Sequence, residues 1–172
     1  MADPKIYTED YSPKELINGV KVIQLKRAVG EEGDFSELMR FDGKGESETF
    51  SGFHIAQLNY STQFPGSIKA WHMHLDQDEI WYVPQHSQLL AGLWDIRKDS
   101  KTKGMTNRVT LGGGSNKMLY IPRGVAHGAV NFSKKLGIIL YFVTEHFNKE
   151  KPDEHRIAWD ALGSDFWKPE RD

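Results

Sequence analysis

The sequence of 172 residues contains no cysteine, which excludes disulfide bonds and thiolate metal ligands. It also lacks any apolar run close to the roughly 20 residues that span a membrane, so no membrane partner is expected. Charge of one sign does not dominate, with 22 basic and 24 acidic residues and no basic stripe, which argues against a nucleic-acid partner. The opening residues MADPKIYTED lack the pattern of a signal peptide, and a cytoplasmic location is expected.

What the sequence does contain suits a folded globular protein: 38% hydrophobic and 12% aromatic residues. The length fits one domain with a sizeable core. We expect a single domain over residues 1–172, with an arm and strand at 1–30, the main sheet region at 53–147 and a C-terminal segment at 148–172 that is partly helical.

Short runs with strand character, separated by turns such as Phe64-Pro-Gly66 and Gly112-Gly-Gly114, dominate the chain. This pattern predicts an all-β sandwich or barrel. The expected strands are Val20–Leu25, Phe53–Tyr60, Ile68–His74, Ile80–Val83, Leu89–Ile96, Thr106–Leu111, Met118–Ile121, Ala129–Phe132 and Ile138–Thr144.

Two imidazoles and a carboxylate follow one another with informative spacing in the stretch Trp71-His-Met-His-Leu-Asp-Gln-Asp-Glu79. Alternate residues of a strand share a face, so His72 and His74 point the same way, about 7 Å apart at the backbone. Glu79 begins the next extended run after a polar turn, where its carboxylate can face the same interior. A second stretch, Pro122-Arg-Gly-Val-Ala-His127, places another histidine just after a tight turn.

These two stretches resemble the paired motifs of the cupin superfamily, although the final glycine of the first motif is missing. The resemblance implies a double-stranded β-helix, that is, a jelly-roll cupin barrel, with an N-terminal arm. It also implies that His72, His74, Glu79 and His127 are metal ligands. Three imidazoles and one carboxylate suit a divalent transition metal such as Mn, Fe, Co, Ni, Cu or Zn. No organic cofactor is expected.

A second resemblance, to the dTDP-4-dehydrorhamnose 3,5-epimerase family, runs from about residue 30 to residue 167. An ordered set of segments carries it: Gly30–Glu37, Gln57–Ser61, Lys69–His72, Trp94–Ser100, Tyr120–Gly128, Leu140–Tyr141 and His155–Asp160. That family needs no metal, and its enzymes remove a proton next to a ketone and return one from the other face. The resemblance implies a sugar or nucleotide-sugar substrate.

Position by position, the epimerase resemblance makes His72 the catalytic base and Tyr141 the catalytic acid. It places the substrate near four further residues, Lys69, Gln57, Asn59 and Phe147. It also implies a homodimer formed by strand exchange, for which Val20–Leu25 is available.

Several positions depart from the epimerase family. Its enolate-stabilising lysine falls at Glu79, and a phosphate-binding arginine falls at Glu32. Its glutamine falls at His74, a metal-type ligand. The aspartate that orients the family's base has no counterpart in a matching motif, and three acidic residues near the C-terminus are the only substitutes: Asp165, Glu170 and Asp172.

Three functions therefore remain open. The first is an epimerase or isomerase acting on a 4-keto sugar. The second is a metal-dependent cupin enzyme, an oxygenase or a metal-assisted isomerase, in which His72 is a ligand and not a free base. The third is a barrel that binds a small ligand without turning it over.

Overall fold

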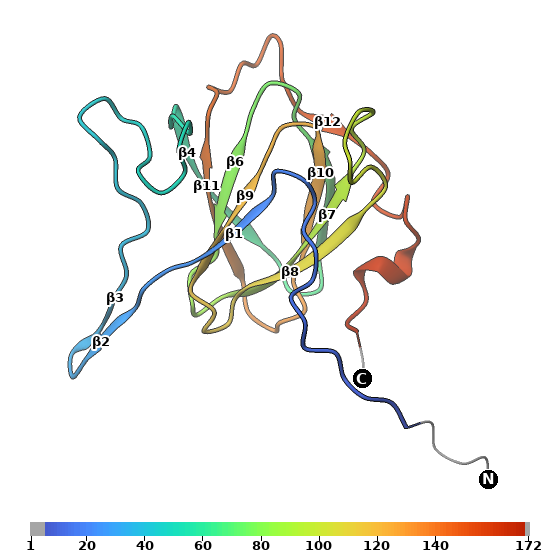
Figure 1. Cartoon of the computed structure of the whole chain (residues 1–172), viewed down its shortest axis with the longest axis horizontal. Coiled ribbons are helices and arrows are strands. Elements are labelled where there is room, and N and C mark those ends of the chain that lie inside the picture. The colour runs from blue at the N-terminus through green and yellow to red at the C-terminus, as the bar shows by residue number, and fades with distance from the viewer. Residues whose placement is uncertain (1–5, 171–172) are drawn as a thin grey trace.

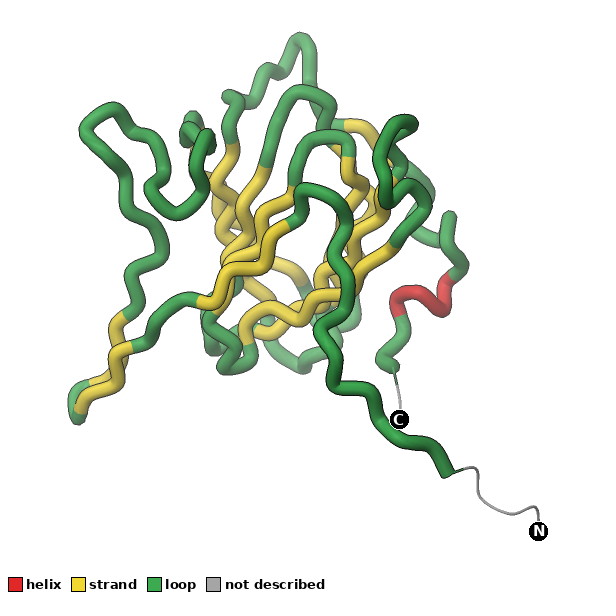
Figure 2. The backbone as a smooth tube through the Cα atoms, viewed as in Figure 1, coloured by secondary structure: helices red, strands yellow, loops and turns green. Residues whose placement is uncertain are grey.

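Strands make up most of the regular structure of residues 6–170, the part of the chain that the computed structural model describes (Figures 1 and 2). The first five residues of the predicted arm lie outside this range. In chain order, the strands are β1 Lys21–Gln24, β2 Ala28–Gly30, β3 Gly33–Phe35, β4 Gln57–Gln63, β5 Ile68–Met73, β6 Glu79–Tyr82, β7 Gln88–Asp95, β8 Thr106–Gly112, β9 Lys117–Ile121, β10 Val125–Val130, β11 Gly137–Val143 and β12 His155–Arg156.

Two antiparallel five-stranded sheets form the body of the described chain, in the orders β1-β9-β6-β11-β4 and β12-β5-β10-β7-β8. One apolar cluster joins them, because Trp81 and Leu119 of the first sheet pack with Leu93 and Val125 of the second. The predicted all-β jelly-roll architecture is thereby confirmed, with side chains filling the space between the sheets.

Each sheet is also covered on its outer face, so strands bury both sides. In β6, Trp81 points into the shared core, whereas Ile80 packs with Phe50 and Phe53 of the loop before β4. On the other sheet, Trp71 packs against Trp167 with ring centroids 4.6 Å apart. Burial on both faces is the reason why β6 shows no alternation of polar and apolar residues.

The predicted helical character of the C-terminal segment is reduced to one turn of 3-10 helix, Ser164–Trp167. Two features limit this helical character. The segment first pairs as β12 with β5, and it then turns at Gly163, whose φ of 84° favours glycine. Trp167 anchors the turn on the outer face of the second sheet.

Most predicted strands agree with the structure to within one or two residues. Two differ: β4 begins at Gln57 because Phe53 belongs to the covering loop, and β10 begins at Val125, ahead of the expected Ala129. The sequence interpretation missed β12 and the hairpin β2–β3, which projects from the body in Figure 1. Between residues 6 and 170, the structure contains no helix with the length and apolar character needed to cross a membrane.

Candidate active site

A cavity of about 640 Å³ opens at one end of the two sheets, and every residue that the sequence assigned as a catalytic, substrate-binding or metal-binding residue lies on it. These residues come from β4, β5 and the position just after it, β6, β10, β11 and the loop after β11: Gln57, Asn59, Lys69, His72, His74, Glu79, His127, Tyr141 and Phe147. The roles that the sequence assigned to them stay predictions, but their placement in one cavity makes a common function physically possible.

Strand pairing brings the three histidines together. His127 of β10 lies directly opposite His72 of β5, and the two rings stack with centroids 5.7 Å apart. His74 follows β5 on the same face, with its ring centroid 5.5 Å from that of His127. Trp71 is buried in the outer cluster instead, as the alternation predicts.

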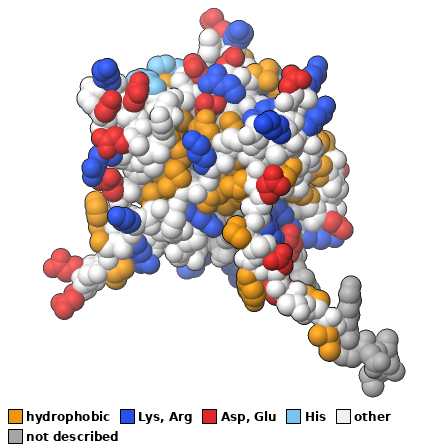
Figure 3. Space-filling view, viewed as in Figure 1, with side chains coloured by type: hydrophobic (Ala, Val, Ile, Leu, Met, Phe, Trp, Pro, Cys, Tyr) orange, Lys and Arg blue, Asp and Glu red, His pale blue; other side chains and the backbone are white. Residues whose placement is uncertain are grey.

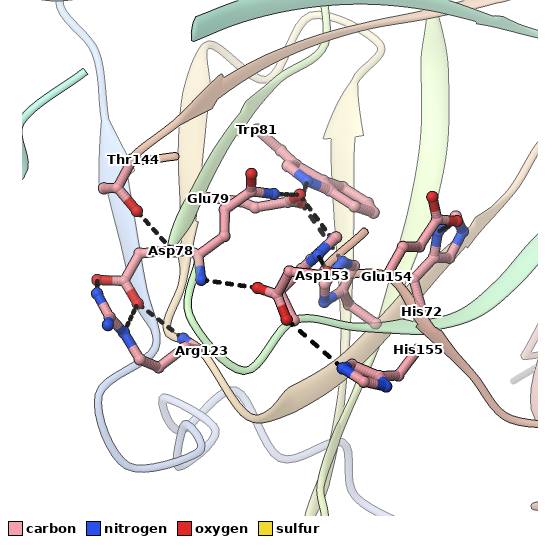
Figure 4. A network of polar contacts seen from close by, with 12 residues as sticks. His72, Asp78, Glu79, Trp81, Arg123, Thr144, Asp153, Glu154 and His155 are labelled. Atoms are coloured by element: carbon pink, nitrogen blue, oxygen red, sulfur yellow. Dashed lines mark hydrogen bonds and ion pairs between the residues drawn. The ribbon is translucent and has the colours of Figure 1, made fainter. Parts of the chain in front are cut away.

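Glu79 lies at the centre of the polar network shown in Figure 4. Its Oε1 accepts a hydrogen bond from the Gln77 side chain at 2.8 Å and lies 3.1 Å from His74 Nε2. Its Oε2 accepts a hydrogen bond from the Trp81 indole at 2.6 Å and lies 3.4 Å from His127 Nε2. The carboxylate therefore joins both imidazoles from a side chain that is only 8% exposed.

Main-chain carbonyls hold the far nitrogen of both imidazoles. His74 Nδ1 contacts the carbonyl of Asp153, and His127 Nδ1 contacts the carbonyl of Val125 at 2.9 Å. A carbonyl oxygen only accepts hydrogen bonds, so each Nδ1 must carry a hydrogen. In the neutral rings, both Nε2 atoms then present lone pairs to the Glu79 carboxylate. Lone pairs facing an anion need a cation between them, either a proton or a metal ion.

The pKa shifts agree with this description. Burial raises the pKa of Glu79, but His127, His74 and the Trp81 hydrogen bond outweigh it and bring the pKa to about 2. Burial lowers the pKa of both imidazoles. For His74, the contact with Glu79 reverses the shift and the pKa is raised, whereas that of His127 stays lowered. Glu79 is therefore ionised, and His74 can carry the proton when no metal is bound.

His74, Glu79 and His127 offer ligand atoms that all lie within 4.8 Å of one another. The fourth predicted ligand, His72, is not part of this group. Its Nδ1 lies 3.6 Å from Glu154 Oε1, and its Nε2 lies 3.4 Å from a nitrogen of Arg156. The structure thus groups three of the four candidate ligands, while the fourth, His72, contacts Glu154 and Arg156.

His72 has the electrostatic properties of a base. Burial lowers its pKa to about 4, and the neighbouring His127 and Arg156 add to the effect. The ring is therefore neutral at neutral pH and can accept a proton. An imidazole in this state suits general base catalysis at a carbon acid.

Tyr141 of β11 has the opposite property. It pairs with Trp81 of β6, and the two rings meet edge to face with centroids 5.3 Å apart. Burial raises the pKa of Tyr141 to about 12, so the phenol keeps its proton at neutral pH. A neutral imidazole and a protonated phenol therefore share the cavity.

The four predicted substrate-binding residues form the rim and one wall of the cavity. Gln57 donates to Asn59 Oδ1 at 2.6 Å and accepts a hydrogen bond from the main chain of Phe147 at 3.0 Å. Phe147 is 67% exposed, so its ring is free to contact a ligand. Lys69 donates to Ser61 and to the carbonyl of Thr62. Polar groups and an aromatic ring are thus available to bind a ligand at the entrance of the cavity.

The sequence interpretation missed the acidic partner of His72. The expected substitutes do not reach the cavity: Asp165 pairs with Lys168, and Glu170 pairs with Arg108 on the outside of the second sheet. Asp172 lies outside the described residues. Glu154 is instead the acidic residue beside His72, because β12 runs along β5. The alternation Glu154-His-Arg156, which mirrors His72-Met-His74, was the available signal.

A neutral imidazole and a protonated phenol in one cavity of an all-β fold suit proton transfer at carbon, which is the chemistry of many isomerases. The chain belongs to the family described as dTDP-4-dehydrorhamnose 3,5-epimerase, whose sequence model matches residues 14–169.

Individual relatives agree with this family. The chain is 41% identical over 146 residues to the spore coat polysaccharide biosynthesis protein SpsL of Bacillus subtilis, covering 84% of this chain and 91% of SpsL. It resembles the epimerase RmlC of Legionella pneumophila, solved in complex with dTDP-4-keto-L-rhamnose, with 27% identity, a TM-score of 0.72, and coverage of 85% and 77%. An epimerase from Sulfolobus tokodaii matches with 26% identity, a TM-score of 0.71, and coverage of 85% and 81%.

Proposed function

We propose that this enzyme inverts the configuration of a carbon next to the ketone of a nucleotide-linked 4-keto sugar. The Legionella relative, which binds a sugar of this class, supports the choice of substrate. One observation carries the proposal: His72, neutral because its pKa is lowered, and Tyr141, protonated because its pKa is raised, line one cavity. A base and an acid in these states can act without prior ionisation at neutral pH.

In the proposed reaction, His72 removes the proton from the carbon next to the ketone, and the C–H electron pair becomes an enolate. Tyr141 then delivers a proton to the opposite face of that carbon. The transfer is feasible because the ketone makes the neighbouring proton acidic. Lys69, Asn59 and Phe147 line the entrance, where they orient the sugar and its nucleotide.

Solvent exchange tests this function directly. The protein is incubated with a dTDP-4-keto-6-deoxy sugar in deuterated water, and deuterium at C3 and C5 is measured by mass spectrometry. We expect incorporation that disappears in His72→Asn. In Tyr141→Phe, we expect the loss of the deuterium that Tyr141 delivers to the opposite face of the carbon. His86→Asn is the matched control, since His86 lies outside the residues lining the cavity. Absence of deuterium at both carbons in the unmodified protein would contradict the proposal.

We further propose that His74, Glu79 and His127 hold a divalent transition metal. The support is the donor set itself: two Nε2 lone pairs fixed by main-chain carbonyls and one ionised carboxylate, converging within 4.8 Å. Three protein ligands with an open position are typical of catalytic metal sites. When bound, such an ion supplies a Lewis acid for a substrate oxygen.

Metal analysis of the purified protein tests this second proposal. We expect close to one equivalent of a transition metal, and less than about a tenth of an equivalent would contradict it. If the protein binds metal but exchanges no deuterium into a 4-keto sugar, the alternative of a metal-dependent oxygenase or metal-assisted isomerase would be favoured. Ligand binding without any turnover would favour a binding module.

A homodimer and a cytoplasmic location stay predictions. The strand offered for exchange, Val20–Leu25, pairs as β1 with β9 of the same chain, so the support for a dimer comes from the projecting hairpin, where Val29 and Phe35 are 72% and 71% exposed. Acidic side chains mark the tip of this projection in Figure 3. Apolar residues on an extended hairpin gain stability when a second subunit covers them. Sedimentation at micromolar concentration should give the mass of two chains, and a monomer would exclude the pairing.

A further inference from the structure

A carboxylate reaches His72 from the strand that borders it. β12 pairs with β5 in antiparallel register, with Arg156 opposite His72. Glu154, two residues before Arg156, lies on the same side, and the two side chains form an ion pair. Glu154 Oε1 lies 3.6 Å from His72 Nδ1, longer than a hydrogen bond. Contacts of this kind often tighten only when substrate binds.

The backbone around Glu154 is fixed on both sides. The carboxylate of Asp153 accepts hydrogen bonds from the main chain of Leu75, Asp76 and Gln77, at 2.8, 2.8 and 3.1 Å. Beyond Arg156, the main chain of Ile157 exchanges two hydrogen bonds with Trp71. The segment from Asp153 to Ile157 is therefore attached along β5, which keeps the backbone of Glu154 next to His72.

Two independent contacts favour the same tautomer of His72. A carboxylate accepts hydrogen bonds, so Glu154 favours a hydrogen on Nδ1. A guanidinium only donates, so the approach of Arg156 to Nε2 at 3.4 Å favours a lone pair on that nitrogen. Both contacts leave Nε2 as the basic atom.

We propose that Glu154 is the positioning residue of His72, which accepts the Nδ1 hydrogen and leaves the Nε2 lone pair to remove the substrate proton. This role rests on the proposed epimerase function. During the step, Nε2 gains the proton from carbon, and the C–H electrons remain on the substrate as the enolate. The Nδ1 hydrogen stays between His72 and Glu154, which stabilises the imidazolium.

Kinetics of Glu154→Gln test the role. An amide can turn its NH2 group toward Nδ1 and favour the wrong tautomer, so we expect kcat to fall by about 10²–10⁴-fold. We expect KM to change by less than about threefold, because Glu154 acts on the proton transfer and not on binding. Glu154→Asp keeps the carboxylate and should recover part of the loss. Glu150→Gln, an exposed change on the same segment, is the matched control and should leave kcat unchanged.

A second measurement does not depend on substrate. In ¹⁵N-labelled protein, NMR should show His72 with its hydrogen on Nδ1, and Glu154→Gln should shift the ring toward the other tautomer. A kcat for Glu154→Gln within about threefold of the unmodified protein, or an unchanged tautomer, would overturn the proposal. If the unmodified protein exchanges no deuterium, the proposed function fails, while the tautomer measurement still decides the role of Glu154.

Discussion

Replacing Glu79 by glutamine separates the metal hypothesis from the stability of the fold. The carboxylate faces two donors, Gln77 and Trp81, and two Nε2 atoms, those of His74 and His127. Each carboxylate oxygen meets one donor and one imidazole. The change removes one negative charge and keeps the shape of the side chain.

A glutamine can satisfy most of these contacts. Its oxygen can keep the Trp81 hydrogen bond, while its NH2 group donates to His74 Nε2 and to a Gln77 amide that has turned over. No buried donor is then stranded, which would otherwise cost about 1–3 kcal/mol. The charge-assisted contact between the Glu79 carboxylate and His74 is lost, however, so we expect Glu79→Gln to lower the free energy of unfolding without metal by about 1.5–3 kcal/mol while keeping the fold.

Metal binding should respond very differently. An ion present at about 100 times its dissociation constant stabilises the folded protein by about 2.7 kcal/mol. For a chain of this size, that raises Tm by about 5–10 °C. Glu79→Gln loses the only anionic ligand of the three, so its Tm should stay nearly constant over the same metal range.

Calorimetric unfolding of chelator-treated protein, with Mn, Co, Ni or Zn added back, measures both quantities. His86→Asn controls for metal held by histidines outside the cavity. The reasoning would be refuted if no ion raised the Tm of the unmodified protein, or if Glu79→Gln responded equally. A loss of stability well above about 3 kcal/mol in metal-free Glu79→Gln would refute the hydrogen-bond description of the site.

Two further changes test the framework. Asp95 is fully buried and accepts hydrogen bonds from Arg97, Ser100 and Thr102, so Asp95→Asn should cost about 2–4 kcal/mol in urea unfolding. Burial raises the pKa of Asp95, but these hydrogen bonds outweigh it and hold the pKa below the ordinary value of 3.8. Its contribution is therefore complete above that pH and is lost as the pH falls, so Asp95→Asn should flatten acid unfolding. Trp167→Ala removes the anchor packed on Trp71 and should cost about 3–5 kcal/mol, and a smaller loss would show that the C-terminal turn contributes little.

Local patterns in the sequence account for much of the fold and for the centre of the site. Alternation in β5 separated His72 from Trp71, and the turn before Glu79 placed this carboxylate at the start of β6. Such features depend on residues close in the chain, whose side-chain directions follow from strand geometry.

The remainder depends on contacts between distant segments. Glu154 reaches His72 only because β12 adds to the edge of the second sheet, and the alternation Glu154-His-Arg156 by itself does not say which strand it pairs with. The same holds for Asp153, whose carbonyl contacts His74 across 79 positions of sequence. The reduction of the predicted helical character of the C-terminal segment to one 3-10 turn has a similar cause, since pairing with β5 competes with local helix formation.

Glu79 stands where the resemblance to the epimerase family places a lysine, and this reversal of charge explains the rest of the site. Two negative charges about 4 Å apart repel by about 4 kcal/mol near a protein surface, enough to slow enolate formation about a thousandfold. A carboxylate is compatible with this chemistry only when a cation neutralises it. His74 and His127, each held at Nδ1 by a carbonyl, point two lone pairs at Glu79 and so provide the place for that cation. His72 lies outside this group beside Glu154, so a cation held there would leave His72 available for the proposed role of base.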